Sequence, residues 1–175
     1  LGLAYREDAA TGVSKVNEFG GRTGEGTIKV NNTGTITLDG TEAYGVYVKN
    51  NNASGTAATT LANNSGTGNL TLSGDKSIGM VADKGTLTND AGAKINMTGQ
   101  EQVAMYANNS SSLINNGEIN LSGTKVTGIY NQGTFTMENG ATGTASVTTS
   151  GEGSISLYAK GETGNPSTTN INSGK

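Results

Sequence analysis

The sequence contains no cysteine, no histidine and no tryptophan, and it has one proline among 175 residues. Without cysteine, the chain has no disulfide, no thiolate nucleophile and no cysteine-ligated zinc site. Without histidine, it lacks the side chain that proteins use most often as a general base and metal ligand. No stretch is apolar over the length that a membrane-spanning helix needs. We therefore expect neither a metal ion nor a cofactor.

Apolar and charged residues are both scarce. Apolar residues make up 32% of the chain and aromatic residues 5%, which is little for a globular domain of this length. A disordered chain and a thin solenoid both tolerate such a composition. Disordered chains usually carry many charges and prolines, whereas only 14% of these residues are charged. The composition thus favours a solenoid, and the net charge of −3 without a basic run argues against binding to nucleic acid.

A short alternating segment that ends in glycine recurs along the chain. Its copies occupy residues 34–40, 68–74, 93–99, 117–123 and 143–151. The last apolar residue of each copy is Leu38, Leu72, Met97, Leu121 and Val147, which gives steps of 34, 25, 24 and 26 residues. Steps near 25 fit a β-helix rung that contains three short strands and three turns. The alternation within each copy is the pattern of a β-strand.

A second segment follows at a constant distance. A small residue stands five positions after each terminal glycine, at Gly45, Gly79, Ala104, Gly128 and Ser156. Alternation then predicts one inward column that contains Val46, Met80, Met105, Ile129 and Leu157. The flanking column contains Tyr44, Ile78, Val103, Thr127 and Ile155. In a parallel stack these columns would form a continuous core, with each rung covering the previous one at roughly 4.8 Å.

A third, weaker segment closes each rung. Its copies occupy residues 27–32, 60–64, 86–90, 112–116 and 135–139. We expect the leucine or methionine of each copy to point inward. The asparagine two residues later should form a ladder at the corner, which predicts a column of Asn31, Asn63, Asn89, Asn115 and Asn139.

Together these segments predict an all-β fold, a right-handed parallel β-helix of about five to six rungs of roughly 25 residues. We interpret residues 1–175 as a single segment of a larger protein. Residues 1–26 fit as an incomplete first rung with a loop at 18–26, residues 27–159 as regular rungs, and residues 160–175 as an expanded last rung. Insertions at 49–60 and 160–170 both follow the second strand, so we expect both at the same corner.

The candidate binding residues fall into two groups. Tyr47, Tyr106, Tyr130 and Tyr158 recur in the outward phase of the second strand, where Val81 completes the column. These rings either bind sugar rings or a protein partner, or stack on one another along the helix axis. We favour stacking. The second group lies in or beside the insertions and contains Asn51, Asn52, Glu162 and Asn165.

The charged residues point to structure rather than to catalysis. Glu42, Lys76, Glu101 and Lys125 alternate in sign in one column, which would pair opposite charges between rungs and oppose slippage of the register. Carbohydrate-cleaving sites need two or three converging carboxylates, whereas the remaining acids of this chain share no column. We therefore expect a protein that is not an enzyme.

Two stretches, NNTGTITLDGTEAYGVY (31–47) and NNGEINLSGTKVTGIY (115–130), carry a family resemblance. They resemble the passenger-domain repeats of type V autotransporter adhesins, most closely those of the RadD-type outer-membrane adhesins of fusobacteria. The resemblance covers residues 27–159. It defines no ligand-binding residue that transfers to this chain.

The resemblance implies a role in virulence and cell adhesion. The segment would be an extracellular stalk on the bacterial cell surface, displayed by a C-terminal outer-membrane barrel of the parent protein. It would attach to a host or bacterial receptor, either a protein or a glycan. Two alternatives stay open, a purely structural spacer and a carbohydrate-active β-helix enzyme.

Overall fold

The computed structural model describes residues 21–24, 28–50, 60–108, 111–137, 145–164 and 166–171. All named elements in these residues are β-strands. Within the same residues, no helix is long and apolar enough to cross a membrane.

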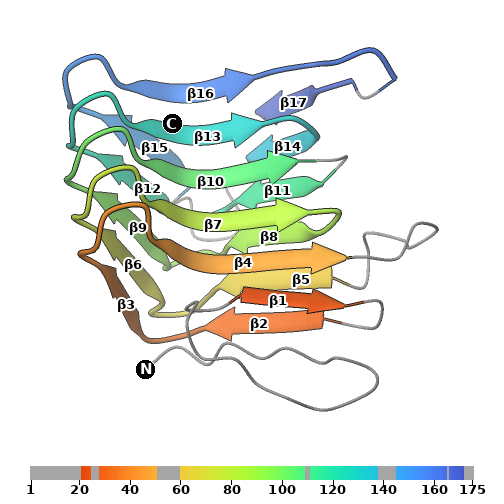
Figure 1. Ribbon diagram of the computed structural model, residues 1–175, viewed down its shortest axis with the longest axis horizontal. Helices are drawn as coiled ribbons and strands as arrows, with labels where there is room; N and C mark the ends of the chain where they lie inside the picture. The colour runs from red at the N-terminus through yellow and green to blue at the C-terminus, as the bar shows by residue number, and fades with distance from the viewer. Residues whose placement is uncertain are drawn as a thin grey trace.

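The strands form three parallel sheets, which the chain visits in the same order in every rung (Figure 1). Sheet A contains β1 (Gly21–Gly24), β4 (Tyr44–Asn50), β7 (Ile78–Asp83), β10 (Val103–Asn108), β13 (Thr127–Asn131) and β16 (Ile155–Ala159). Sheet B contains β2 (Ile28–Asn32), β5 (Thr60–Asn64), β8 (Thr86–Asn89), β11 (Ser112–Asn115), β14 (Thr134–Met137) and β17 (Thr168–Ile171). Sheet C contains β3 (Thr35–Leu38), β6 (Asn69–Leu72), β9 (Lys94–Met97), β12 (Glu118–Leu121) and β15 (Ser146–Thr149).

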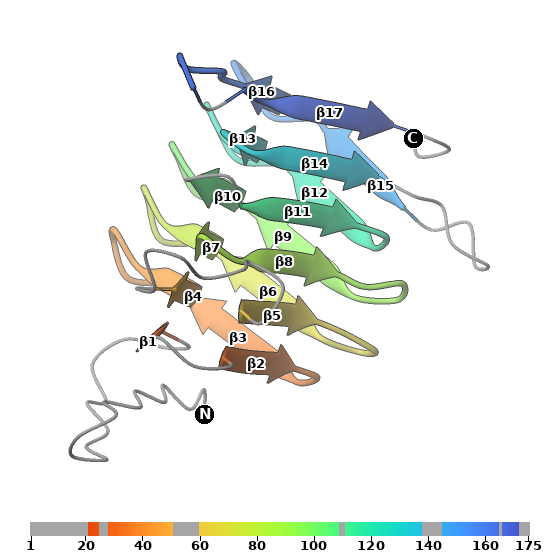
Figure 2. The same cartoon turned by 90° about the vertical axis from the view of Figure 1, so that its right-hand side faces the viewer.

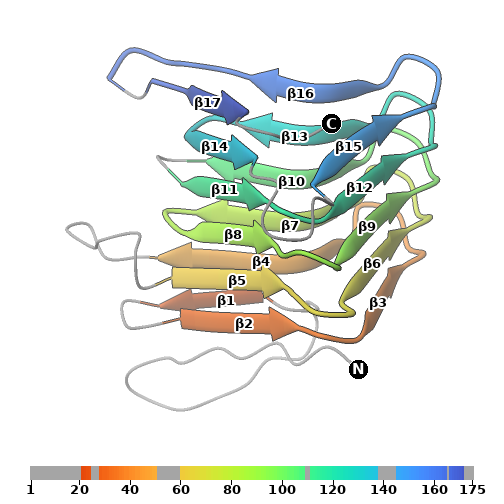
Figure 3. The same cartoon turned by 180° about the vertical axis from the view of Figure 1, so that it is seen from behind.

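The coil is right-handed. In Figure 1 the strands of sheet A run from left to right across the front, and those of sheet B return from right to left behind them. Figure 3, seen from behind, shows sheets B and C carrying the chain back to the next strand of sheet A, one level higher. The predicted right-handed parallel β-helix is therefore confirmed, with strands stacked rung on rung (Figure 2).

Inward side chains of the three sheets form one continuous core. The predicted column in sheet A is confirmed, because Val46, Met80, Met105 and Ile129 are register partners and are fully buried. Its last member, Leu157, pairs with Ile129 and is partly buried. Sheet B contributes Ala62, Leu87, Leu113 and Phe135 in the same way, and sheet C contributes Leu72, Met97 and Leu121. Each buried Val, Leu, Ile, Met or Phe side chain stabilises the fold by about 1.5–3 kcal/mol relative to an exposed one.

The flanking column of sheet A lies outside the core, contrary to the prediction. Gly45 and Val46 are both buried, so the inward–outward alternation is interrupted just after Tyr44. A Cβ atom on Gly45 would come within 2.5 Å of the carbonyl oxygen of Gly79, so the two rungs approach closely at this point. As a result Tyr44 and Ile155 are 47% and 46% exposed.

The asparagine ladder of sheet B is shifted by one residue from the prediction in its first two rungs. Asn64, not Asn63, pairs with Asn89, and Asn32 pairs with Asn64. β5 has five residues and β8 has four, and the two strands align at their carboxyl ends. The same shift buries Ala62 in place of Leu61. Asn139 lies outside the described residues.

Two further differences concern the ends of the β-helix. Glu118 pairs with Ser146, a step of 28 residues, so Val147 lies beside Ile119 and Thr149 takes the place beside Leu121. Residues Gly21–Gly24, which the sequence indicated as part of a loop, form β1 and pair with β4. The connections after β4 and β16 both lead from sheet A to sheet B, so the two predicted insertions fall at the same corner. Their predicted bounds were too wide, because Lys49 and Asn50 belong to β4, Thr60 to β5 and residues 168–170 to β17. Residues 51–59 and 165 lie outside the described residues.

The alternating charges occupy a turn rather than a strand. The four residues adopt left-handed backbone conformations, with φ of 59° at Glu42, 58° at Lys76, 53° at Glu101 and 54° at Lys125. Their side chains are exposed, and within the described part of the chain no ion pair joins two of them. The expected pairing is therefore absent. Backbone bonds hold the turns instead: the Glu42 amide, for example, donates to the Asp75 carbonyl over 2.9 Å.

Asparagine side chains link four successive rungs inside the corner between sheets B and C. The Nδ2 of Asn32 donates to Asn64 Oδ1 over 2.8 Å, and Asn64 and Asn89 each donate to the next asparagine, Asn89 and Asn115, over 2.9 Å. Asn64, Asn89 and Asn115 are fully buried. Buried amides need partners, and in this column every rung provides one for the next.

This ladder predicts a large difference between two asparagine variants. Asn89→Ala would remove two buried ladder bonds, the acceptor for one Asn64 N–H and the donor to Asn115 Oδ1, while Asn64 keeps its bond to the Lys94 carbonyl. We expect a cost of roughly 2–5 kcal/mol in the free energy of unfolding. The matched control is Asn96→Ala. Asn96 also makes two ladder bonds, to Asn69 and from Asn120, each over 2.9 Å, but on the half-buried outer face of sheet C. Its loss should cost about 1 kcal/mol or less, because water replaces the partners.

Urea unfolding of both variants measures the difference. Equal destabilisation by the two substitutions would contradict the structural role assigned to the buried ladder.

Candidate binding face on sheet A

The outer face of sheet A presents three columns of different chemistry. The column near the amino ends of the strands is largely apolar and contains Tyr44, Ile78, Val103, Thr127 and Ile155. The central column contains Tyr47, Val81, Tyr106, Tyr130 and Tyr158. The column near the carboxyl ends is polar and contains Lys49, Asp83 and Asn108. The face therefore grades from apolar through aromatic to polar across its width.

Three tyrosine rings of the central column stack on one another. The ring centroids of Tyr106 and Tyr130 are 5.0 Å apart, and those of Tyr130 and Tyr158 are 4.9 Å apart. The Tyr106 hydroxyl donates to Oε1 of Gln132 over 3.1 Å. Burial, followed by the neighbouring Tyr130, raises the pKa of Tyr106 above its ordinary value. The stacking that the sequence favoured is thus present in the upper three rungs.

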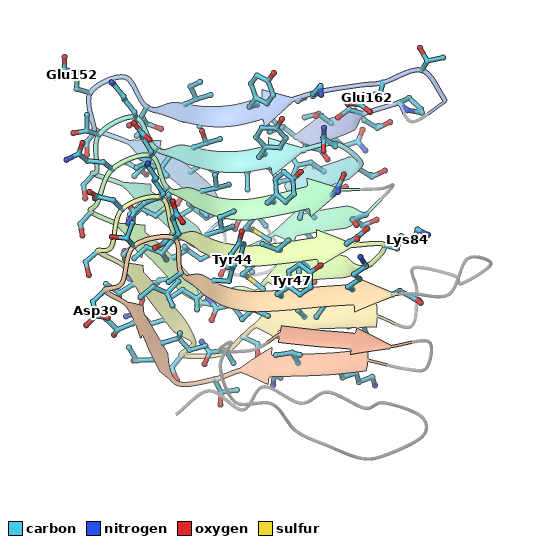
Figure 4. All side chains as sticks on the ribbon, viewed as in Figure 1. Asp39, Tyr44, Tyr47, Lys84, Glu152 and Glu162 are labelled. Carbon is cyan, nitrogen blue, oxygen red and sulfur yellow. The ribbon has the colours of Figure 1, made fainter. Side chains whose placement is uncertain are left out.

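The column is interrupted at Val81, and a hollow lies there. Val81 is 4% exposed and pairs with Tyr47 below and Tyr106 above. The hollow has a volume of about 580 Å³ and is lined by Tyr44, Tyr47, Ile78, Val81, Asp83, Tyr106 and Asn108. The rings of Tyr44 and Tyr47 meet edge to face, with centroids 6.5 Å apart, on the outer side of β4 (Figure 4).

The polar rim of the hollow carries no excess charge. Lys49 Nζ lies 3.3 Å from Asp83 Oδ2, and the Asp83 side chain is only 14% exposed. Asn108 stands beside Asp83 in the next rung. The rim therefore offers a carboxylate and an amide beside an apolar floor, with the carboxylate charge balanced by Lys49.

The predicted binding residues separate into those on this face and those at the corner. Tyr47, Tyr106, Tyr130 and Tyr158 share one outward column, as predicted. Glu162 lies in the connection from β16 to β17, where it forms an ion pair with Lys160 over 2.6 Å (Figure 4). The hydrogen bond to Glu162 raises the pKa of Lys160. Asn51, Asn52 and Asn165 lie outside the described residues.

Sequence reasoning missed the part that Tyr44 and Ile78 play in this face. Strict alternation from Val46 assigned both to the core. The only signal in the sequence was the glycine at 45 and 79, which marks the interruption of the strand without giving its direction.

One family model matches part of the chain. Residues 83–162, which extend from the end of β7 past the end of β16, match the model described as the BigA fourth domain. No curated protein and no solved structure matches the chain. Over these residues the chain is similar to that domain. The similarity suggests a domain of a bacterial surface protein. The finer resemblance to RadD-type autotransporters stays a prediction.

The stacked rings predict a measurable coupling between neighbours. In a double-mutant cycle, Tyr106→Leu and Tyr130→Leu should show a coupling free energy of about 0.5–1.5 kcal/mol, because such aromatic pairs add that much beyond burial. The matched cycle of Tyr47→Leu with Tyr130→Leu should show none, since three rung steps separate these positions. Denaturant unfolding of the single and double variants provides the values. A zero coupling for the first pair would contradict the stack.

Proposed function

We propose that this chain is a non-catalytic stalk and adhesion segment of a bacterial autotransporter adhesin. Its place would be outside the cell, in a parent protein anchored in the outer membrane, where it would contribute to attachment and virulence. The observation that carries the proposal is the outer face of sheet A, where an aromatic column and an apolar column lie side by side on a regular β-helix. Tyr44, Ile155 and Tyr158 are exposed there, and most of the other members are half-buried. The match to the BigA fourth domain supports a surface location.

A β-helix suits a stalk for a physical reason. Each rung contacts only its neighbours, so length is added by repetition and the outer faces stay free to carry binding residues. The absence of cysteine also suits a chain that crosses an oxidising compartment before it folds.

A non-catalytic role is consistent with the acids of the binding face. Asp83 is the only carboxylate among the described residues that line the hollow, whereas glycoside hydrolysis uses two facing carboxylates. We therefore consider carbohydrate cleavage less well supported than a non-catalytic binding role.

A structural spacer is the second candidate, and the tyrosine stack favours it. Tyr130 already packs against both Tyr106 and Tyr158, so these rings have a structural use without any ligand. In that case attachment would depend on other parts of the parent protein.

Attachment of coated beads separates the two candidates. Beads that carry the folded 175-residue chain should bind bacterial or epithelial cells, and soluble folded chain should compete, because the binding face belongs to this segment. Heat-unfolded chain on beads is the control. Chains shortened in the 49–60 and 160–170 insertions test whether the corner contributes. Binding no higher than that of albumin-coated beads would contradict the adhesion proposal and leave the spacer.

A further inference from the structure

We propose that the hollow over Val81 binds one neutral pyranose ring of a glycan. The proposal rests on the proposed adhesive function and names the class of ligand that the face would take. Three features of the hollow carry it: its width along the helix axis, its apolar floor and its polar rim.

The width follows from the stacking of the rungs. Successive strands of a sheet lie about 4.8 Å apart, and the upper tyrosines fill this spacing with centroid distances of 5.0 and 4.9 Å. Tyr47 and Tyr106 are two rungs apart, with the shorter Val81 between them. Their separation along the helix axis is roughly 10 Å, which is wide enough for one sugar ring between them. That ring would lie about 4.8 Å from each tyrosine, close to the spacing of the tyrosines in the upper stack.

The floor and wall of the hollow fit the apolar face of a sugar. Val81 lies at the base but is only 4% exposed, so the apolar contact surface comes from Ile78 and from the rings of Tyr47 and Tyr106. Tyr44 adds an aromatic edge beside Tyr47. A pyranose presents C–H groups on its faces, which pack against aromatic rings. The volume of about 580 Å³ falls within the range of about 300–1,000 Å³ typical of small-ligand sites.

The rim fits the hydroxyl edge of the same ring. Asp83 provides carboxylate oxygens that accept hydrogen bonds, and the Asn108 amide both donates and accepts. Lys49 balances the Asp83 charge over 3.3 Å, so the site favours neither an acidic nor a basic sugar. A sugar ring carries several hydroxyls that can donate to this carboxylate while its C–H face covers the apolar floor, whereas a leucine or phenylalanine side chain of a protein partner has no such donor. The observations therefore favour a neutral sugar over a peptide.

Saturation-transfer NMR with lactose, maltose and N,N′-diacetylchitobiose tests the site directly. At least one of these disaccharides should receive saturation from the folded chain and shift the ring protons of Tyr47 and Tyr106. Val81→Tyr should abolish this signal, because the new ring fills the space, while the melting temperature stays equal or rises as the tyrosine column becomes continuous. Thr148→Tyr adds the same ring on the exposed outer face of sheet C and should leave binding unchanged.

A second variant tests the site from its upper wall. Tyr106→Ala should weaken binding by roughly 2- to 12-fold, the value of one aromatic contact. Circular dichroism of each variant shows whether the β-helix is retained.

Three results would overturn the proposal: no saturation of any of the three sugars, binding that persists in Val81→Tyr, or Val81-dependent binding of an aromatic peptide without binding of a sugar. Bead attachment distinguishes this failure from that of the adhesive function. If one of these three results is obtained while beads that carry the unaltered chain still attach to cells, adhesion stands and only the sugar site is wrong.

Discussion

The constraint behind this fold is that each strand residue lies directly over its counterpart in the previous rung, about 4.8 Å away. Each side chain must therefore pack against, or hydrogen-bond with, the side chains at the same position in the neighbouring rungs. Met80 and Met105 satisfy this by packing in a fully buried column, and Asn64 and Asn89 satisfy it by a hydrogen bond of 2.9 Å between their amides. The tyrosines satisfy it by stacking. The outer face of sheet A is a consequence of the same rule.

Repetition is why much of the fold could be predicted. Val46, Met80 and Met105 each follow a glycine at the same interval. A column of this kind indicates both which residues form the strand and which of them point inward. Where two residues serve a column equally well, the pattern fails. Asn63 and Asn64 are chemically identical, and the choice between them depends on strand alignment and on burying Ala62 rather than Leu61. A local alternation does not contain this information.

The candidate site was predictable to a similar degree. Alternation identified the outward column of Tyr47, Tyr106, Tyr130 and Tyr158, but it assigned Tyr44 to the core because it has no means to foresee two consecutive buried residues at Gly45 and Val46. The hollow depends on the size of a single side chain between two rings. Residues at the insertions do not repeat, so no column predicts where their side chains lie.

The β-helix depends on the register between its rungs, and disulfide cross-linking can probe this register because the chain has no native cysteine. Asn120 of β12 pairs with Thr148 of β15, and both lie on the outer face of sheet C. The double variant N120C/T148C should form a disulfide on mild oxidation, since directly opposed strand residues lie within the Cα range of about 4.4–6.8 Å that disulfides need. In N120C/S146C, which a 26-residue step would bring together, the thiols should stay free. Cross-linking of the second pair and not the first would show that the register of β12 and β15 is wrong.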